Sequence, residues 1–522
     1  MFLVTFVRVV LHRPMFQRVL IANRGEIAVR VIRACRELGI ASIAIYSDAD
    51  ARAPHVLLAD RAIRIGPPSP AESYLSSSAI LEAARATGAE AIHPGYGFLS
   101  ENAAFASACA RAGIVFIGPP AQVIEQLGSK IAARQLAQKA QVPIVPGETP
   151  ADQSNEAIAV AARRVGLPVL LKPSAGGGGI GMKDVRDERA LLPAIEQARR
   201  EAASAFGDGT LYVERLIDCP RHVEIQILAD NHGNVVHLFE RECSIQRRHQ
   251  KVVEETPSTA LTPALRQRMG DAAVALARAA GYRNAGTVEF LLEGSGDAAS
   301  FYFLEVNTRL QVEHPVTEQV TGVDLVRAQI AVAAGDALPW SQGSLMQRGH
   351  AIEVRVYAED AARRDLPQAG PLLLYREPSM PGIRVDAGVV EGGDIGVHYD
   401  PMIAKLIATG ETRDAARRRA VEALRNYPIL GIRTNVAFLI ELLQHPRFVA
   451  GDIDVRFLDV EGAALRARAA GAEVPPEALE VAAAARVGSS TFRGQAEPGN
   501  DLSAEPRGAN ADPWATLRGF RG

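Results

Sequence analysis

Apolar and polar positions follow two different periods along the chain. From Gln17 a short apolar run, RVLIAN, precedes a glycine-bearing turn and a segment with helical spacing of its apolar residues, and this order recurs up to about residue 102. Strands that alternate with helices of about ten to fifteen residues are typical of a parallel, doubly wound sheet. The pattern therefore predicts an α/β domain at the N-terminal end. Later strand-rich stretches predict α+β architecture for the remainder.

A different pattern runs from Gly286 to Glu318, where it predicts two strands, 287–292 and 301–306, joined by a glycine-rich turn. Side chains alternate across a strand, so Glu289 faces away from its apolar neighbours, and Glu305 and Asn307 share one face. In a hairpin these three oxygen-bearing side chains converge. Mg²⁺ prefers such ligands, and a solvated acidic face is the alternative.

The residues directly after this hairpin favour the functional alternative. Arg309 can bind an anion, Gln311 is an amide, and Glu313 can act as a base, all within a few residues of the predicted metal ligands. A merely solvated face would be expected to include serine, lysine and glycine. This density of charged and hydrogen-bonding groups predicts a reaction centre.

A glycine-rich segment lies earlier, at 167–182, where an apolar strand delivers Lys172 to a run of glycines that includes Gly177, Gly178 and Gly179. Consecutive glycines cost backbone entropy, but they let N–H groups approach phosphate oxygens closely. We interpret the segment as a lid over a nucleotide, with a flexible linker as the alternative. It is no P-loop, because GxxxxGK[ST] is missing, and NRGE at 23–26 lacks the GxGxxG pattern of NAD binding.

Further along, residues 211–217 and 222–228 are predicted strands, and 240–258 is rich in arginine, histidine and lysine. We place this charged run between strands of the sheet that carries the acidic hairpin, facing phosphate or bicarbonate, and a solvated surface is the alternative. A β-rich region is expected at 370–410. From about residue 460 the composition shifts to alanine, glycine, proline and arginine, which predicts a helix-prone or disordered tail.

The composition of the chain limits the number of domains and the kinds of partner that it can bind. The 522 residues allow three or four domains, and a hydrophobic fraction of 48% with 22% charged residues is ordinary for a globular protein. A net charge of −3 provides no basic field for nucleic acid. The four scattered cysteines indicate reduced thiols in a cytoplasmic protein. The apolar residues 1–14 are too short to span a membrane, and we interpret them as a start-site extension.

With these motifs in view, the chain from about residue 15 to 459 resembles the biotin carboxylase component of biotin-dependent acyl-CoA carboxylases (acetyl-, propionyl- or methylcrotonyl-type), in the ATP-grasp superfamily. The matching stretches are IANRGEIA, HPGYGFLSEN, KPSAGGGGIGM, PRHVEIQ, QRRHQKVVEE, GTVEF, FLEVNTRLQVEHPVTE and HYDPMIAKL. The resemblance implies a doubly wound N-terminal domain at 15–127, an ATP-grasp domain at 128–330 with a lid at about 145–214, a β-rich C-terminal domain at 348–459, and an Ala-rich tail, a truncated linker, at 460–522.

The resemblance also implies a two-step reaction. ATP and bicarbonate give carboxyphosphate, and the carboxyl group then passes to N1′ of biotin. By matching, Mg²⁺ or Mn²⁺ would be held by Glu289, Glu305 and Asn307. The nucleotide site would comprise Lys130, Lys172, Gly177, Gly178, Gly179, Glu214, Arg215, Ile217, His222, Gln246 and His249. Bicarbonate would be bound by Lys251, Arg309, Gln311 and the backbone of Val312. Glu313 would deprotonate it, and Arg355 would stabilise the biotin enolate.

Some positions depart from the family pattern. Ile180 stands where these enzymes commonly carry arginine, and no Met-Lys-Met biotin site occurs, since Met182-Lys183-Asp184 lies in the lid. We therefore expect biotin on a separate carrier, a further partner that supplies the carboxyltransferase, and a homodimer or larger complex. Two alternatives remain: another ATP-grasp ligase, and a catalytically silent or truncated subunit that serves as a scaffold.

Overall fold

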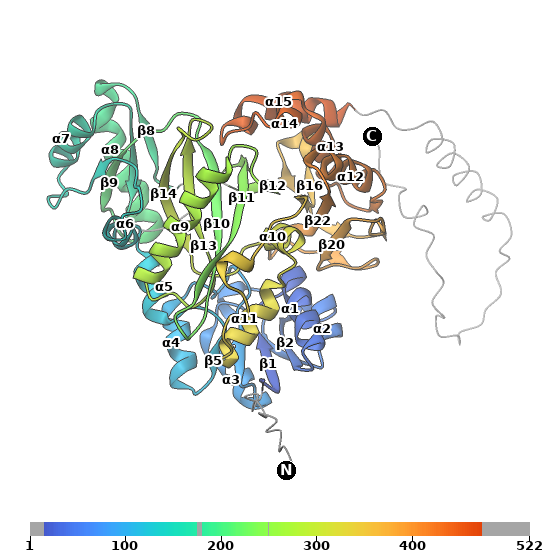
Figure 1. Ribbon diagram of the computed structural model, residues 1–522. Helices are drawn as coiled ribbons and strands as arrows, with labels where there is room; N and C mark the ends of the chain where they lie inside the picture. The colour runs from blue at the N-terminus through green and yellow to red at the C-terminus, as the bar shows by residue number, and fades with distance from the viewer. Residues whose placement is uncertain (1–14, 175–179, 249, 472–522) are drawn as a thin grey trace, which may run out of the picture.

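The N-terminal region is a five-stranded parallel sheet with helices on both faces (Figure 1). The computed structural model describes residues 15–174, 180–248 and 250–471. The strand order is β3-β2-β1-β4-β5. The strands are β1 (Arg18–Ile21), β2 (Ala41–Ser47), β3 (Arg61–Gly66), β4 (Ala91–His93) and β5 (Val115–Phe116). The prediction of a doubly wound sheet is confirmed.

The alternating directions of the side chains along β1 explain why helices cover both faces of the sheet. Val19 and Ile21 pack with α1 (Gly25–Glu37), whereas Leu20 packs with α3 (Ser77–Thr87) and α4 (Ala103–Arg111) on the other side. Because successive side chains point to opposite faces, a continuous apolar run is buried on both sides. The helices α2 (Pro54–Leu58), α5 (Ala121–Gly128) and α6 (Lys130–Lys139) complete this part of the chain.

A small four-stranded sheet with its own apolar core forms the region predicted to be the lid. Its strand order is β6-β9-β7-β8, and helices α7 and α8 pack against it. The elements are β6 (Gly147–Glu148), α7 (Asn155–Val165), β7 (Val169–Pro173), β8 (Lys183–Val185), α8 (Leu191–Phe206) and β9 (Leu211–Arg215). In Figure 1 this region lies to one side of the large sheet.

The largest element is an eight-stranded antiparallel sheet, in the order β14-β13-β10-β11-β12-β15-β22-β20. The strands are β10 (Arg221–Ala229), β11 (Val235–Arg247), β12 (Gln250–Thr256), β13 (Asn284–Glu293), β14 (Ser300–Asn307), β15 (His350–Tyr357), β20 (Ile383–Ala387) and β22 (Met402–Gly410). On one face, apolar side chains of β10 and β13 pack against α9 (Pro263–Ala279). On the other face, α10 (His314–Thr321) packs next to the predicted reaction centre.

The charged run at 240–258 differs from its prediction. It does not connect strands, because most of it forms β11 and β12 in the middle of the sheet. Arg241 and Glu254 are fully buried there, paired with opposite charges. The alternative of a solvated surface does not hold for these two residues, because cross-strand ion pairs satisfy their charges inside the sheet.

The C-terminal helices are α12 (Arg413–Arg425), α13 (Val436–Gln444), α14 (Pro446–Ala450) and α15 (Phe457–Ala470). Helix α15 crosses the predicted boundary at 459/460, because Leu458 and Leu465 are buried in the same core as α13. The predicted extension at 1–14, Gly177, Gly178, Gly179, His249 and the tail from residue 472 lie outside the described residues. The boundaries of the domains stay a prediction.

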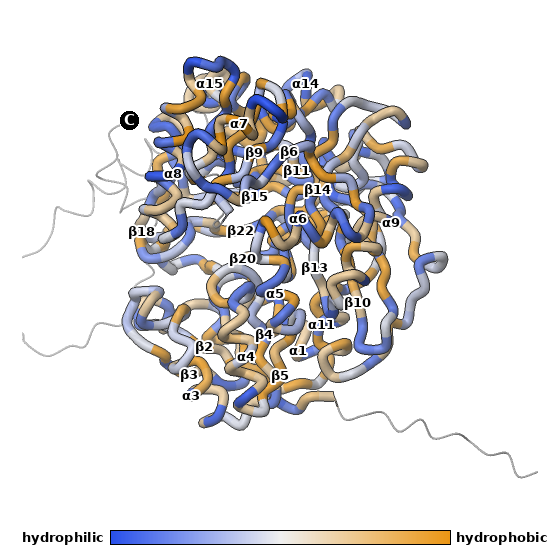
Figure 2. Tube along the Cα trace, turned by 90° about the vertical axis from the view of Figure 1, so that its left-hand side faces the viewer, coloured by the Kyte–Doolittle hydropathy of each residue, from blue (hydrophilic) through white to orange (hydrophobic). Residues whose placement is uncertain are grey.

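The described helices mix polar and apolar residues along their length (Figure 2). Across the described ranges, none of them is both long enough and apolar enough to cross a membrane.

Candidate active site

Two adjoining cavities open between the lid region and the charged face of the large sheet. The first, of about 580 Å³, contacts the lid strands and the start of β10. The second, of about 370 Å³, lies over the sheet and reaches α10. They share five lining residues: Lys172, Met182, His222, Gln246 and Leu304. These five residues therefore form the boundary between the two cavities.

The first cavity collects residues predicted to bind the nucleotide. Lys172, at the end of β7, is buried, and its Nζ lies 2.6 Å from Oε2 of Glu214. Burial lowers the pKa of Lys172, but Glu214 outweighs it and raises the pKa, so the ammonium persists. Arg215 forms a two-pronged pair with Glu293, at 3.0 and 2.8 Å, and Ile217 is a buried apolar wall of this cavity.

Lys130 lies at the start of α6, where Ser129 caps the helix, and it lines the second cavity together with Lys172. Burial lowers the pKa of Lys130, and Glu305 opposes that effect. Two lysines that converge on one cavity are suited to phosphate oxygens.

The predicted acidic hairpin forms as expected. Glu289 and Glu305 are direct cross-strand partners on β13 and β14, and Nδ2 of Asn307 donates to Oε1 of Glu289 at 2.8 Å. Burial, and then the neighbouring Glu289, raises the pKa of Glu305. Two facing carboxylates are costly without a cation, and all three side chains offer oxygen. The donor set therefore fits Mg²⁺ or Mn²⁺.

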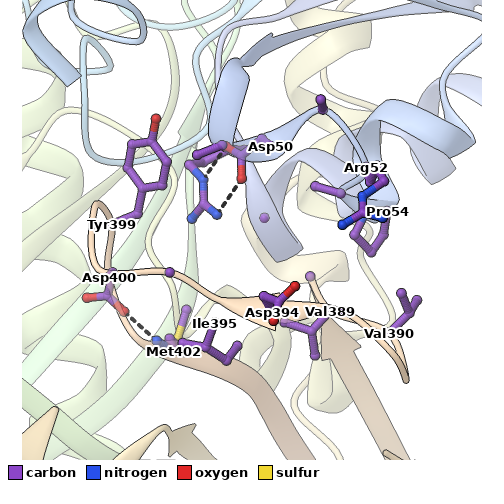
Figure 3. A pocket seen from close by; sticks show the side chains of 18 of the residues that line it. Asp50, Arg52, Pro54, Val389, Val390, Asp394, Ile395, Tyr399, Asp400 and Met402 are labelled. Atoms are coloured by element: carbon purple, nitrogen blue, oxygen red, sulfur yellow. Dashed lines mark hydrogen bonds and ion pairs between the residues drawn. The ribbon is translucent and has the colours of Figure 1, made fainter. Parts of the chain in front are cut away.

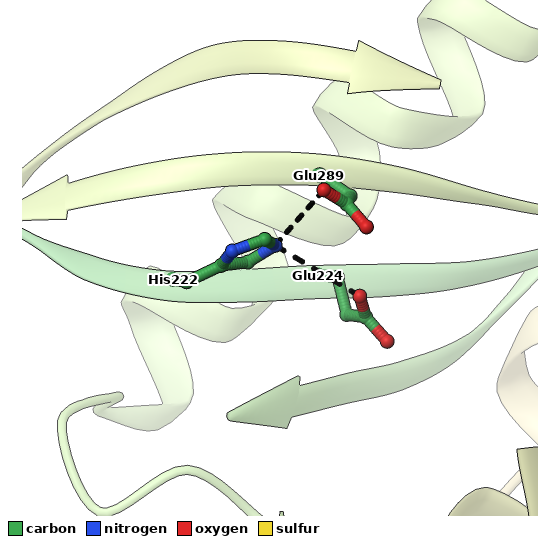
Figure 4. A group of neighbouring side chains, drawn as sticks. All are labelled: His222, Glu224 and Glu289. Carbon is green, nitrogen blue, oxygen red and sulfur yellow. Dashed lines mark ion pairs between the residues drawn. The ribbon is translucent and has the colours of Figure 1, made fainter. Parts of the chain in front are cut away.

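A second group beside the hairpin contains a nitrogen donor (Figure 4). Nε2 of His222 lies 3.0 Å from Oε2 of Glu289 and 4.0 Å from Oε2 of Glu224. On the other side of the ring, Nε2 of Gln246 lies 2.7 Å from Nδ1 of His222. Burial lowers the pKa of His222, but Glu289 raises it above its usual value. The His222 ring therefore lies against the carboxylate of Glu289, a predicted metal ligand, and helps to hold it in place.

Lys251 stands at the centre of the second cavity. Its Nζ donates to Oε2 of Glu224 at 2.5 Å, to Oε1 of Glu289 at 3.0 Å and to Oε1 of Glu313 at 2.5 Å. One ammonium group thus connects the predicted metal site with the predicted base. Gln311 supports the same point, because its Nε2 donates to Oε1 of Glu289 at 2.9 Å.

Glu313 lies between two cations. Lys251 is on one side, and on the other Nη2 of Arg355 donates to Oε2 of Glu313 at 3.0 Å. Burial raises the pKa of Glu313, but Lys251 and Arg355 outweigh it, so the pKa falls well below its usual range. Glu313 is therefore ionised at neutral pH. It can accept a proton only where the same cations also lower the pKa of the proton donor.

Arg309 is held by the N-terminal region. Its Nε donates to Oε2 of Glu101 at 2.9 Å, and its NH2 donates to Oδ1 of Asn307 at 2.9 Å. The guanidinium is thus oriented at the edge of the second cavity, which Val312 also lines. A planar fork in this place suits a planar anion such as carbonate.

Several residues that complete this network were not predicted from the sequence. Glu224 and Arg241 pair beneath Lys251, and Arg241 also donates to Oε1 of Gln311 at 3.2 Å. Glu254 accepts from Nε of Arg355 at 2.7 Å. Glu224 alternates with apolar residues in VEIQ, which is a signal for a strand position, whereas which residue it faces depends on the neighbouring strands.

A third cavity, of about 340 Å³, lies between residues 48–54 and 388–402 and contains none of the predicted site residues (Figure 3). Arg24 donates to Asp50 at 2.7 and 2.8 Å on its wall, and Tyr399 stands beside them. Asp400 lines both this cavity and the second one.

A lid sheet over a charged antiparallel sheet, with lysines and paired carboxylates at their junction, defines an ATP-grasp type of ligase. Family models agree. They match residues 15–124 as "Biotin carboxylase, N-terminal domain", 129–341 as "Carbamoyl-phosphate synthase L chain, ATP binding domain" and 353–460 as "Biotin carboxylase C-terminal domain".

Curated relatives and solved structures also indicate the biotin carboxylase family. Biotin carboxylase of Halalkalibacterium halodurans is 52% identical over 85% of this chain and 97% of its own length. The alpha subunit of mitochondrial methylcrotonoyl-CoA carboxylase of Oryza sativa is 52% identical over 85% of this chain, which spans only 60% of that relative. The biotin carboxylase domain of Hydrogenobacter thermophilus 2-oxoglutarate carboxylase, solved with MgADP and bicarbonate, superimposes with a TM-score of 0.82 at 45% identity, covering 87% of this chain and 99% of that one. The chain belongs to the biotin carboxylase family.

Proposed function

We propose that the chain catalyses ATP-dependent carboxylation of biotin on a carrier, with bicarbonate as the carboxyl donor, as the biotin carboxylase subunit of an acyl-CoA carboxylase. The observation that carries this proposal is the position of Glu313 between Lys251 and Arg355, beside the paired carboxylates Glu289 and Glu305. The scaffold alternative has less support, because the chain retains the residues that the reaction would use: Lys172, Glu289, Glu305, Arg309, Glu313 and Arg355.

In the first step, Lys130 and Lys172 hold the phosphates of ATP, and Arg309 and Lys251 hold bicarbonate in line with the γ-phosphorus. Glu313 accepts the bicarbonate proton as the bicarbonate oxygen attacks, which yields carboxyphosphate and ADP. A Mg²⁺ or Mn²⁺ ion held by Glu289, Glu305 and Asn307 would neutralise phosphate charge when bound. Positioning and electrostatic neutralisation are the main contributions to this kind of transfer.

In the second step the bond between the carboxyl carbon and the phosphate oxygen breaks, the departing phosphate accepts the N1′ proton of biotin, and the carboxyl group is transferred to N1′. Arg355 supplies a fixed positive charge for the negative charge that develops on the ureido oxygen of biotin. Its two carboxylate partners, Glu254 and Glu313, keep the guanidinium in one orientation. The nucleotide base and ribose would be surrounded by Glu214, Arg215, Ile217, His222 and Gln246.

The wider setting is also part of the proposal. We infer a cytoplasmic protein whose partners are a biotin carboxyl carrier and a carboxyltransferase subunit, in a homodimer or larger complex. In support, two of the curated relatives are named as parts of larger enzymes, the alpha subunit of a methylcrotonoyl-CoA carboxylase and one subunit of a pyruvate carboxylase. The biotin carboxylase domain of the Hydrogenobacter thermophilus enzyme was solved as a dimer.

The decisive experiment measures ADP release from Mg-ATP with and without bicarbonate and free biotin. We expect turnover that requires bicarbonate and increases with biotin, and the variant Glu313→Gln serves as the matched control that should lose it. ATP binding without bicarbonate-dependent ADP release would support the scaffold alternative. Turnover with a different acid in place of bicarbonate would indicate another ATP-grasp ligase.

A further inference from the structure

Lys405, on β22, is a buried lysine that the roles above leave unassigned. Its side chain is 0% exposed, and its Nζ donates to the carbonyl oxygen of Val312 at 2.6 Å. Lys405 is also the direct cross-strand partner of Arg355 on β15, so both side chains share the face of the sheet next to α10. A buried ammonium group is costly unless it is paired and hydrogen-bonded, so we expect Lys405 to have a specific role at this position.

The counterions of Lys405 come from different regions of the chain. Oε1 of Glu26 lies 3.5 Å from its Nζ, and Oδ2 of Asp386 on β20 lies 3.9 Å away. Glu26 belongs to the first turn of α1, in the N-terminal region. Within the described residues, neither carboxylate oxygen of Glu26 has a hydrogen-bond partner. Burial raises the pKa of Glu26 to about 7 even though Lys405 lowers it, so this carboxyl group changes its charge near neutral pH.

The approach of α1 to the C-terminal region is close and fixed. A Cβ atom on Gly388 would lie 2.4 Å from the backbone nitrogen of Glu26, so only glycine fits at this contact. Glu26 is therefore held near β20 and β22 by backbone packing, independently of its charge. The motifs IANRGEIA and HYDPMIAKL, which had no role in the catalytic proposal, meet at this point through Glu26 and Lys405.

The ionisation of these groups agrees with the geometry. Burial lowers the pKa of Lys405, but Glu26, Glu353 and Asp386 outweigh it, although Arg384 opposes them. The nearby His314, first residue of α10, has its pKa lowered by burial and by Lys405, and stays neutral. Lys405 is therefore a charged donor at neutral pH, with Val312 as its hydrogen-bond acceptor.

We propose that Lys405 is a positioning residue for the bicarbonate site, with Glu26 as its counterion from the N-terminal region. A peptide unit is planar and trans, so fixing the Val312 carbonyl also fixes the N–H of Glu313 and the direction in which the chain presents the base. The inference rests on the proposed function and deepens it: Lys405 contacts no substrate, and acts by holding the segment that binds bicarbonate and carries Glu313.

The test compares Lys405→Met, which keeps the length of the side chain and removes its donors, with the wild-type protein. We expect the KM for bicarbonate to rise about tenfold or more, the scale for loss of electrostatic preorganisation, while the KM for ATP changes less than about twofold. A second readout does not depend on activity. Hydrogen–deuterium exchange in peptides that cover residues 310–316 should become faster, and exchange in the lid should stay unchanged.

Two further variants separate positioning from general destabilisation. Glu26→Gln keeps Lys405 but removes one of its counterions, and should produce the same pattern with a smaller rise, about threefold. Arg413→Met breaks another, partly buried ion pair, in which Nε of Arg413 donates to Oε2 of Glu255 at 2.6 Å. The hydrogen-bond partners of Arg413 in the described residues are Glu255 and Val449, not Val312. Arg413→Met should lower stability and leave the KM for bicarbonate unchanged.

A Lys405→Met protein with a wild-type KM for bicarbonate and unchanged exchange at 310–316 would overturn the proposal. If Lys405→Met does not fold, Glu26→Gln provides the test. A wild-type KM for bicarbonate together with wild-type hydrogen–deuterium exchange at 310–316 in that variant would also overturn the proposal. A wild-type protein without bicarbonate-dependent ADP release would refute the proposed function. The exchange experiment would then still establish or reject the contact between Lys405 and the Val312 segment.

Discussion

The two large sheets of the molecule use their faces differently. In the five-stranded N-terminal sheet, both faces are apolar: Leu20 and Ile43 pack on one side and Val19 and Ile21 on the other. In the eight-stranded sheet, β10 and β13 turn apolar side chains to α9 but acidic ones to the active site. The first sheet is stabilised mainly by removal of apolar surface from water, and the second also depends on matched charges.

The difference has a physical consequence. Removing atoms from an apolar contact lowers the free energy of unfolding in proportion to the number of atoms removed. Removing one partner of a buried ion pair leaves the other charge uncompensated, which lowers the free energy of unfolding further. Substitutions in the charged face should therefore be more costly than substitutions of similar size in the N-terminal sheet. The predictions below test this contrast, from the largest expected effect to the smallest.

Arg241→Met should have the largest effect on stability. Arg241 is fully buried and donates to Oε1 of Gln226 at 2.7 Å, to Thr317 at 3.0 Å and to Thr287 at 3.1 Å, besides its pair with Glu224. Breaking a buried pair by removing one partner costs about 3–5 kcal/mol. Denaturant unfolding of both proteins measures this difference, and a loss below about 1 kcal/mol would contradict the contrast between the sheets.

Glu313→Gln and Arg355→Ala should each lower biotin-dependent turnover by roughly 10²-fold or more, the usual scale for acid–base and electrostatic groups. That factor corresponds to about 2.7 kcal/mol of activation free energy. Steady-state ADP release is the measurement, with nucleotide affinity as the control for intact folding. Near-normal turnover in either variant would remove the role assigned to that residue.

The N-terminal region should respond to pH through His55. This buried histidine has its pKa lowered to about 4 by burial; Asp50 raises the pKa and Arg24 lowers it further. The unfolded chain binds a proton near pH 6.5 and the folded chain does not, so stability is fully present above that pH and declines as the pH falls toward 4. The expected loss between pH 7 and pH 5 is about 2 kcal/mol.

The check for His55 is a comparison of thermal unfolding at pH 7 and pH 5 in wild type and His55→Gln. The variant lacks the titrating group, so its loss of stability between pH 7 and pH 5 should be smaller than that of the wild type by about 2 kcal/mol. Identical pH dependence in the two proteins would show that His55 is solvated or ionised in the folded state.

The smallest effect is expected from Ile43→Val in the N-terminal sheet. Ile43 is 2% exposed, and removing one methyl group from such a position costs about 0.5–1.5 kcal/mol. Turnover at saturating substrate should not change, because the cluster around Ile43 includes none of the proposed site residues that the structure describes. If Ile43→Val proved as costly as Arg241→Met, the two sheets would not differ in the way described here.

Much of this architecture could be predicted from the sequence. The alternation of strands and helices gave the doubly wound sheet, and the alternation within 286–307 brought Glu289, Glu305 and Asn307 to one face, as β13 and β14 show. These are local signals, because they depend on neighbours along the chain. The resemblance added the family, which the comparisons confirm.

The network beneath the active site was harder to predict. Glu224, Arg241 and Glu254 are far apart in sequence, and they meet only because β10, β11, β12 and β15 are neighbours in the sheet. Lys405 is more distant still, since its role depends on Val312 and Glu26. Which charges face each other follows from strand order and register, and hydrophobic periodicity specifies neither of them.

The pairing of β12 with β15 has a practical meaning for protein engineering. The match to the ATP-binding model ends at residue 341 and the match to the C-terminal model begins at 353, yet the two parts share one hydrogen-bonded ladder in which Val253 pairs with Val354. A chain divided at that junction would expose two open sheet edges, which favours aggregation. Split reporters, circular permutants or chimaeras should therefore keep residues 221–410 together. They should exchange the small sheet at 147–215, whose strands, among the residues that the structure describes, pair with one another and not with the large sheet.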